Sequence, residues 1–119
     1  MKKILICYGT RPEYIKVEPI ILHELSQHHN IQTLFTGQHK DIGQGAVKPD
    51  YTFEMQDSAP NRLNSIISSI TGSYSLDKVL EDGFTHVLVQ GDTASAFTCA
   101  LAAFNKGLKV IHLEAGLRT

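Results

Sequence analysis

The amino-acid sequence predicts an α/β fold in which helices cover both faces of a mainly parallel sheet, a doubly wound arrangement of the Rossmann-like kind. First, short apolar runs alternate along the chain with segments of helical periodicity. Second, these runs are continuously apolar, which is typical of strands that are buried on both faces. Third, a length of 119 residues suffices for one domain with one hydrophobic core.

Five short runs are predicted to form the strands of this sheet. Residues 3–8 are expected to be fully buried, whereas residues 31–36 and 51–55 form weaker strands, the latter suited to an edge. Residues 85–90 and 109–114 are predicted to be inner strands. Right-handed crossovers favour the order 3-2-1-4-5, so the first and fourth strands are neighbours where the winding reverses.

Helices are predicted between the strands from apolar residues spaced three and four apart. These apolar positions are Val17, Ile20, Ile21 and Leu25, then Leu63, Ile66, Ile67 and Ile70, and finally Phe97, Ala100, Leu101 and Phe104. A shorter helical piece is expected around Leu76, Val79 and Leu80. Pro19 is expected to bend or restart the first helix, and Gly107 to end the last one.

The composition excludes several classes of function. Eleven Lys and Arg against 12 Asp and Glu give a net charge of −1, so the chain has no overall attraction to nucleic acid or to anionic membranes. No run approaches the ~20 apolar residues of a membrane span, and the basic start is followed by too short an apolar run for a signal peptide. A cytoplasmic location is therefore expected. Cys7 and Cys99 are interpreted as reduced core residues.

Polar residues follow four of the five predicted strands, in runs that begin at Gly9, Thr36, Gln90 and Glu114. Because the carboxyl ends of parallel strands meet at one edge of a sheet, these runs are expected to lie together. Ligands of open α/β sheets bind in this place. The runs contain Arg, His and three carboxylates. Turns alone do not require so many charged and titratable side chains.

The first of these runs suggests an anion site. Pro12 suits the first position of a helix that is capped near Thr10 or Arg11, and free N–H groups at a helix start favour an anion. Arg11 can bind phosphate or carboxylate through two parallel hydrogen bonds, and Lys16 adds a second cation. The run has neither a GxGxxG fingerprint nor a GxxxxGK[ST] loop, so neither NAD nor ATP is predicted. The alternative is a tight turn with two solvated cations.

Two carboxylates follow the fourth and fifth strands. If these strands pair, they lie ~5 Å apart, and Asp92 and Glu114 face one pocket. Close carboxylates oppose joint ionisation, which raises one pKa toward the range useful for proton transfer. Two structural alternatives remain open. Asp92 caps the helix that starts near Thr93, or Glu114 forms an ion pair with Arg118 or a neighbouring lysine.

Other polar residues carry weaker signals. His39 follows Gln38 at the same predicted edge and is a candidate for binding a ligand. His112 lies inside an apolar strand and is expected to be a core histidine. Ser95 has no obvious partner base and is expected to stabilise the start of its helix. No group of His, Cys and carboxylates has metal-ligand spacing, so no metal is predicted.

At these same residues the sequence resembles the non-hydrolysing UDP-N-acetylglucosamine 2-epimerases. The matching strings are GTRPE at residues 9–13 followed by Lys16, TGQH at 36–39, QGDTAS at 90–95 and HLEAGLRT at 112–119. They occur in the family's order, and they span nearly the whole chain. Hydrolysing relatives tend to carry an Ala-Asp pair where this chain has Pro12 and Glu13.

The resemblance implies an enzyme, an isomerase with two Rossmann-like domains that face each other in a GT-B-like fold. Residues 1–119 would be the amino-terminal domain, and the carboxy-terminal nucleotide-binding domain would be absent from this chain. Such enzymes interconvert UDP-GlcNAc and UDP-ManNAc by elimination and re-addition of UDP, for surface polysaccharide synthesis, without a metal or redox cofactor. The chain alone is expected to be inactive, and its full-length parent to be a homodimer.

The resemblance also implies roles for individual residues. Asp92 and Glu114 would be the catalytic acid–base or substrate-positioning carboxylates. Arg11 and Lys16 would contact the nucleotide or stabilise the departing diphosphate, and Gln38, His39 and Arg118 are further candidates for binding the substrate. Gln38 and Arg62 match positions of a second, activating UDP-sugar site, but Asp41 stands where such members carry an amide, so activation is left open.

Three other functions remain open at this point. One is an epimerase that acts on a related UDP-diacetamido sugar, which the matching strings do not exclude. Another is a glycosyltransferase of the same fold, against which the pair of carboxylates argues, because epimerisation at carbon 2 needs proton transfer. The last is a binding module that holds a phosphosugar without catalysis.

Overall fold

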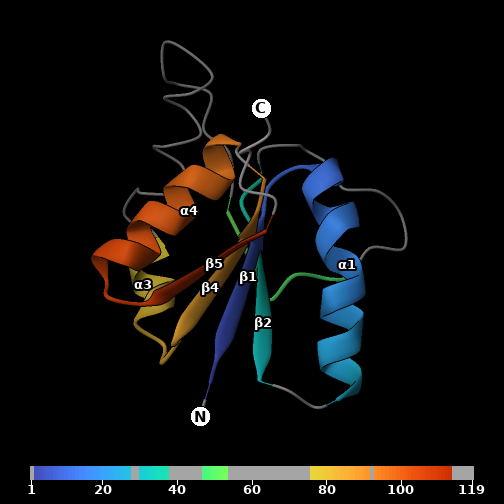
Figure 1. Cartoon of the computed structure of the whole chain (residues 1–119), viewed down its shortest axis with the longest axis horizontal. Helices are drawn as coiled ribbons and strands as arrows, with labels where there is room; N and C mark the ends of the chain where they lie inside the picture. Colours follow the sequence, from blue (N-terminus) through green and yellow to red (C-terminus); the bar gives the residue numbers. More distant parts are fainter. Residues whose placement is uncertain (1, 28–29, 38–46, 54–75, 92, 114–119) are drawn as a thin grey trace.

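The computed structural model describes residues 2–27, 30–37, 47–53, 76–91 and 93–113, which form one parallel sheet between layers of helices (Figure 1). The strand order is β3-β2-β1-β4-β5, which confirms the predicted order. The strands are β1 (Ile4–Tyr8), β2 (Ile31–Phe35), β3 (Tyr51–Thr52), β4 (His86–Gln90) and β5 (Lys109–Leu113). All four pairings are parallel.

The described helices lie on both faces of the sheet (Figure 1). They are α1 (Arg11–Ser26) on one face and α3 (Leu76–Leu80) and α4 (Ala94–Asn105) on the other. The helix predicted at Leu63–Ile70 lies outside the described residues. No helix in the described part of the chain is both long enough and apolar enough to cross a membrane.

The central strand β1 explains why the first apolar run is continuous. Leu5 and Cys7 belong to the core under α3 and α4, whereas Ile6 and Tyr8 belong to the core under α1. All four side chains are at most 2% exposed. Because successive side chains of a strand point to opposite faces, a strand covered on both sides has no position for a polar residue.

Helix α1 is one continuous helix, so it does not restart at Pro19. Val17 and Ile21 are fully buried, as predicted from their spacing. Pro19 is exposed, and its ring removes the donor that would pair with the carbonyl of Ile15, which is also exposed. Water can satisfy that carbonyl, so the helix tolerates the proline on this face.

Helix α4 buries the face opposite to the one predicted. Three of the four predicted core positions are largely exposed: Phe97 at 61%, Leu101 at 47% and Phe104 at 72%. Ala96, Cys99 and Ala103 are at most 3% exposed and take the core positions instead. The helix packs its small side chains against β1 and β4, and this brings its backbone close to the sheet.

The end of α4 has the geometry that Gly107 predicted. Gly107 has a φ of 80°, in the left-handed region that favours glycine. The N–H of Gly107 donates to the carbonyl of Phe104 at 3.0 Å, and that of Leu108 donates to the carbonyl of Ala103 at 3.0 Å. This pair of bonds is a Schellman motif, and it satisfies carbonyls that the helix itself leaves unpaired.

Strand β5 differs from its prediction, because it is an edge strand of the described sheet rather than an inner one. Lys109 and His112 are exposed, and the residues between them are half-buried. The continuous apolar run therefore predicted the strand correctly but not its position. By contrast, the assignment of β3 to the other edge is confirmed.

The two cysteines are free and buried, which confirms that both are core residues. A hydrogen bond with the Cys99 thiol, together with burial, raises the pKa of the Cys7 thiol well above its usual range. Since the thiolate is the reactive form, Cys7 is a poor nucleophile at neutral pH.

Tyr8 combines a buried hydroxyl with a ring that packs against other aromatic residues. Within the described residues, its hydroxyl is the buried side-chain atom that has no hydrogen-bond partner. Burial raises the pKa of Tyr8 to about 12, and nearby Thr33 opposes this shift without completing a hydrogen bond of normal geometry. The ring itself packs against Tyr14 and Phe35, with centroid distances of 5.2 and 5.8 Å.

Replacing Tyr8 with Phe is expected to reduce the loss of stability at alkaline pH. The folded chain keeps the phenol proton up to about pH 12, whereas the unfolded chain releases it near pH 10. The contribution of Tyr8 is therefore complete below pH 10 and is lost as the pH rises toward 12, at up to about 1.4 kcal/mol per pH unit. Urea unfolding of both proteins near neutral pH and at about pH 11 measures this difference. Equal alkaline losses would contradict it.

Candidate functional site

The carboxyl ends of β1, β2, β4 and β5 lie at one edge of the sheet, as expected for parallel strands (Figure 1). We call this edge the carboxyl rim, and its described residues are 9–13, 36–37, 90–91 and 93–95. The prediction that the polar runs after these strands meet at one edge is confirmed for the described residues. The contacts below show how closely the runs approach one another.

Gly9 marks the point of closest approach on the rim. A Cβ at this position would lie 2.1 Å from Oγ1 of Thr36 and 2.4 Å from Oγ of Ser95. The hydroxyls of Thr36 and Ser95 are buried and share a hydrogen bond of 2.8 Å. The segments after β1 and β2 therefore meet the start of α4 at a point where only glycine fits. Ser95 links α4 to the end of β2, a role that its position in the sequence did not indicate.

Glu13 is a buried carboxylate that joins two of the rim segments. It is 3% exposed, and its Oε1 accepts hydrogen bonds from the N–H groups of Gly9 at 2.8 Å and Thr10 at 3.2 Å. Its Oε2 accepts a hydrogen bond from the hydroxyl of Thr93, which follows β4. The N–H of Glu13 in turn donates to Oγ1 of Thr10 at 3.3 Å, and this reciprocal pair is a capping box.

No role for Glu13 was predicted from the sequence. The signal that indicates one is the spacing Thr10-x-x-Glu13 directly after a buried strand, which is a capping-box sequence. Pro12 is the second residue of α1 rather than the first, because Thr10 is the cap and the helix begins at Arg11.

Because of this capping box, the predicted anion site cannot depend on free N–H groups at the start of α1. The N–H groups of Gly9, Thr10 and Glu13 already have partners within the rim, and Pro12 has no N–H group. The carboxylate of Glu13 also places a negative charge at the helix start, where a bound anion was expected. Attraction for an anion must therefore come mainly from side chains. Arg11 and Lys16 are both exposed in the first turns of α1.

Thr93 caps α4. Its Oγ1 accepts a hydrogen bond from the N–H of Ala96 at 3.2 Å, and its backbone is extended. The capping role considered for Asp92 is therefore filled by Thr93.

Gly91 forms two hydrogen bonds with β5. Its N–H donates to the carbonyl of Leu113 at 2.8 Å, and its own carbonyl accepts a hydrogen bond from Nε2 of His112. Its φ of 77° is in the left-handed region, which explains the glycine. His112 is exposed, so its assignment as a core histidine is wrong. The physical reason is that β5 has a neighbouring strand on one side only within the described sheet.

The premise for the predicted carboxylate pair is confirmed, because β4 and β5 are neighbours with Gln90 opposite Leu113. Asp92 and Glu114 themselves lie outside the described residues. The same holds for four other predicted site residues: Gln38, His39, Arg62 and Arg118. Within the described part of the chain, no three His, Cys, Asp or Glu side chains are grouped so that they could hold a metal ion.

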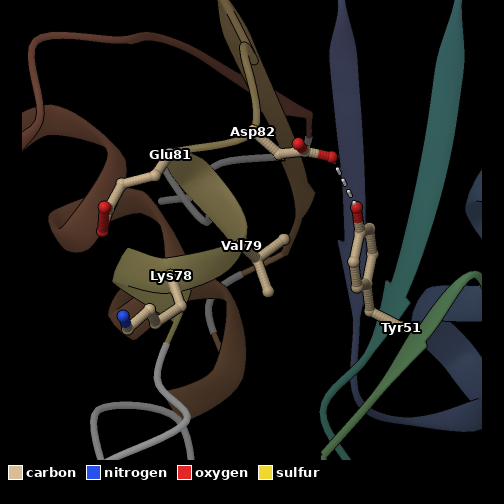
Figure 2. Close-up of a pocket in the computed structure, with 5 residues that line it drawn as sticks. All are labelled: Tyr51, Lys78, Val79, Glu81 and Asp82. Atoms are coloured by element: carbon tan, nitrogen blue, oxygen red, sulfur yellow. Dashed lines mark hydrogen bonds between the residues drawn. The ribbon is translucent and has the colours of Figure 1, made fainter.

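An open hollow of about 350 Å³ lies between β3 and α3 (Figure 2). It is lined by Tyr51, Lys78, Val79, Glu81 and Asp82. The hydroxyl of Tyr51 donates to Asp82 at 3.3 Å, and the backbone carbonyl of Asp82 accepts from Nζ of Lys3 at 2.6 Å. Since Lys3 directly precedes β1, the hollow lies toward the amino ends of the strands. Its lining has one lysine against two carboxylates, which does not suit an anionic ligand.

A family model described as UDP-N-acetylglucosamine 2-epimerase matches residues 23–119. The chain is 41% identical to the UDP-N-acetylglucosamine 2-epimerase of Neisseria meningitidis, over 98% of this chain and 32% of that protein. It is 37% identical to the enzyme of the same name from Campylobacter jejuni, over 100% of this chain and 32% of that protein. The chain therefore spans about a third of the length of these curated relatives.

Solved structures show the same similarity. The crystal structure of the UDP-GlcNAc 2-epimerase from Neisseria meningitidis bound to UDP-GlcNAc matches with a TM-score of 0.81 and 40% identity. The match covers 98% of this chain and 33% of that one. The enzyme from Methanocaldococcus jannaschii in complex with UDP-GlcNAc and UDP matches with a TM-score of 0.77 and 29% identity, over 99% of this chain and 33% of that one.

Replacing Gly9 with Ala is expected to destabilise the chain by about 1–3 kcal/mol or more, because the new methyl group must displace the paired hydroxyls of Thr36 and Ser95. Gly107→Ala is the control. It strains a φ of 80°, but its Cβ would meet nothing within 4 Å. Its expected loss is about 1 kcal/mol from backbone strain alone. Urea unfolding compares the two variants, and a Gly9→Ala loss no larger than that of Gly107→Ala would contradict close packing at the rim.

Proposed function

Because this chain belongs to the UDP-N-acetylglucosamine 2-epimerase family, we propose that its full-length parent interconverts UDP-GlcNAc and UDP-ManNAc. The observation that carries the proposal is the pairing of β4 with β5. This pairing makes neighbours of the two strand ends that Asp92 and Glu114 closely follow. Epimerisation needs one group that removes a proton from carbon 2 and another that returns a proton to the opposite face. Two carboxylates at adjacent strand ends meet that need.

Residues 1–119 are proposed to be the amino-terminal Rossmann-like domain of a two-domain, GT-B-like enzyme. The carboxy-terminal nucleotide-binding domain would then lie outside this chain. The coverage of about a third of the relatives' length supports this division. A site formed between two domains is incomplete in either one, so the chain by itself is expected to be inactive.

The proposed reaction is an elimination followed by an addition. A carboxylate removes the proton from carbon 2 while the bond between carbon 1 and the UDP oxygen breaks, which yields a glycal and UDP. UDP then adds back at carbon 1 as carbon 2 receives a proton on the opposite face. Asp92 and Glu114 are proposed as the groups that move these protons or position the sugar. Neither the elimination nor the addition passes a hydride or an electron to another group, so the proposed steps use no redox cofactor.

The departing UDP carries the negative charge that the site must stabilise. Arg11 and Lys16, both exposed in the first turns of α1, are proposed to stabilise its diphosphate. Gln38, His39 and Arg118 are proposed as further contacts to the substrate. Gln38 and Arg62 are the candidates for an activating UDP-sugar site.

We also propose the setting in which the enzyme acts. A nucleotide-activated sugar is the usual donor for glycosyl transfer, so UDP-ManNAc would supply the synthesis of surface polysaccharide. The cytoplasm is the proposed location of this step.

The full-length parent is further proposed to be a homodimer. Phe97, Leu101 and Phe104 form one exposed apolar face of α4, which we call the α4 ridge. Helix α4 contains no charged residue, so two copies of this ridge can face each other across a two-fold axis without charge repulsion. A charged partner would find no complementary group there. This favours a second copy of the same protein.

Asp92→Asn and Glu114→Gln in the full-length protein are each expected to lower turnover by about a hundredfold or more, because each change removes a group that moves a proton. The measurement is incubation with UDP-GlcNAc in heavy water, followed by proton NMR of carbon 2. Asp82→Asn makes the same chemical change at the amino end of the sheet, and this variant is expected to retain full turnover. Carbon-2 exchange at the normal rate in both rim variants would refute their roles.

Leu101→Gln combined with Phe104→Gln is expected to convert the full-length dimer into a monomer, since the ridge then loses most of its apolar area. Analytical ultracentrifugation measures this change. Leu22→Gln is the matched control, because Leu22 is an apolar residue of α1, 51% exposed, on the opposite face of the sheet. A parent that is monomeric before mutation would also count against the proposal.

A further inference from the structure

We propose that Glu13 is a positioning residue of this reaction, which sets the placement of the segment that carries Asp92 relative to the segment that carries Arg11. The inference rests on the function proposed above. It goes further because it assigns a role to the buried Glu13. Capping of α1 explains only part of the hydrogen bonding of this residue.

The hydrogen bonds of Glu13 extend beyond its own helix. A capping box needs one carboxylate oxygen, and Oε1 of Glu13 fills that role toward Thr10 while it also binds the N–H of Gly9. The second oxygen, Oε2, accepts from Thr93, a residue 80 positions away in the sequence. Both oxygens of Glu13 are therefore engaged, one with the segment after β1 and one with the residue before α4.

The contacts of Glu13 fall directly beside the proposed site residues. Arg11 follows Thr10, whose N–H is held by Oε1. Asp92 lies in the sequence between Gly91 and Thr93, and both neighbours are anchored. Gly91 is bound by β5 through Leu113 and His112, and Thr93 is bound by Glu13.

The anchoring of Gly91 and Thr93 would affect the reaction by setting the distance between Asp92 and the carbon atom whose proton it moves. A misplacement of about 1 Å in a proton-transferring group can lower the rate by about a hundredfold. Capture of the substrate depends mainly on groups elsewhere, so it should be much less sensitive to the placement of Asp92. A positioning role therefore predicts a loss in kcat with little change in KM.

The test uses Thr93→Val and Thr93→Ser in the full-length protein. Valine has nearly the shape of threonine but cannot donate to Glu13, whereas serine keeps the hydroxyl. We expect kcat for UDP-GlcNAc epimerisation to fall by about tenfold to a hundredfold in Thr93→Val, with KM changed by less than about threefold. Thr93→Ser is expected to restore kcat to within about threefold of the unaltered protein.

Loss of stability needs its own control, because Thr93→Val also removes the cap of α4. Tyr14→Phe provides it. This change removes two hydrogen bonds in the described structure, one to Glu18 at 2.8 Å and one from the N–H of Val47 at 2.7 Å. The backbone N–H of Tyr14 donates to the carbonyl of Thr10 on the rim at 3.0 Å, and Tyr14→Phe leaves this bond in place. The two hydrogen bonds that the change removes lie outside the rim segments, so we expect Tyr14→Phe to lower Tm without lowering kcat.

Should Thr93→Val fail to fold, Glu13→Gln tests the same link. Glutamine keeps the size of the side chain, but it removes the negative charge and one of the two oxygens that accept hydrogen bonds from Gly9, Thr10 and Thr93. A fall of kcat by about tenfold with a nearly constant KM is expected.

The outcomes separate this inference from the proposed function. Unaltered kcat in Thr93→Val, or a kcat that falls equally in Tyr14→Phe, would overturn the positioning role while leaving the epimerase activity in place. Absence of carbon-2 exchange in the unaltered full-length protein would instead refute the proposed function itself.

Discussion

Close contact between β1 and α4 at Gly9 is the constraint on which the rest of this structure depends. Side chains larger than hydrogen are excluded at Gly9, because the hydroxyls of Thr36 and Ser95 occupy the space that a Cβ would need. The same proximity requires small residues on the inner face of α4, and Ala96 and Cys99 meet this requirement. The large apolar side chains of α4 are consequently left on its outer face.

This packing also organises the chemistry of the rim. Since α4 starts close to the ends of β1 and β2, Thr93 at its amino end comes within reach of Glu13. Glu13 then satisfies donors of the segment after β1 and fills the start of α1 with a fixed negative charge. The N–H groups of Gly9, Thr10 and Glu13 at this helix start therefore have hydrogen-bond partners within the chain. Exposed cations such as Arg11 and Lys16 remain as the groups suited to an external diphosphate.

Several predictions that depended on local sequence were confirmed in the described residues. Apolar runs identified the strands, and chirality rules for crossovers identified their order. Gly107 marked the end of α4 because glycine adopts a positive φ without the steric cost that other residues incur. Other predictions failed at α4 and β5, including the inner position expected for β5. Periodicity selected the larger residues of α4 as its core, although the short distance to the sheet favours the smaller ones, and His112 was assigned to the core of a strand that has one neighbour.

The sequence by itself determined the strands, the end of α4 at Gly107 and the edge at which the described polar runs meet, since each of these follows from residues close together in the chain. It did not determine which face of α4 is buried, or that Glu13 and Thr93 would share a hydrogen bond across 80 positions. Those features depend on the distance between α4 and the sheet. That distance results from packing among residues distant in sequence, so only the tertiary structure could decide it.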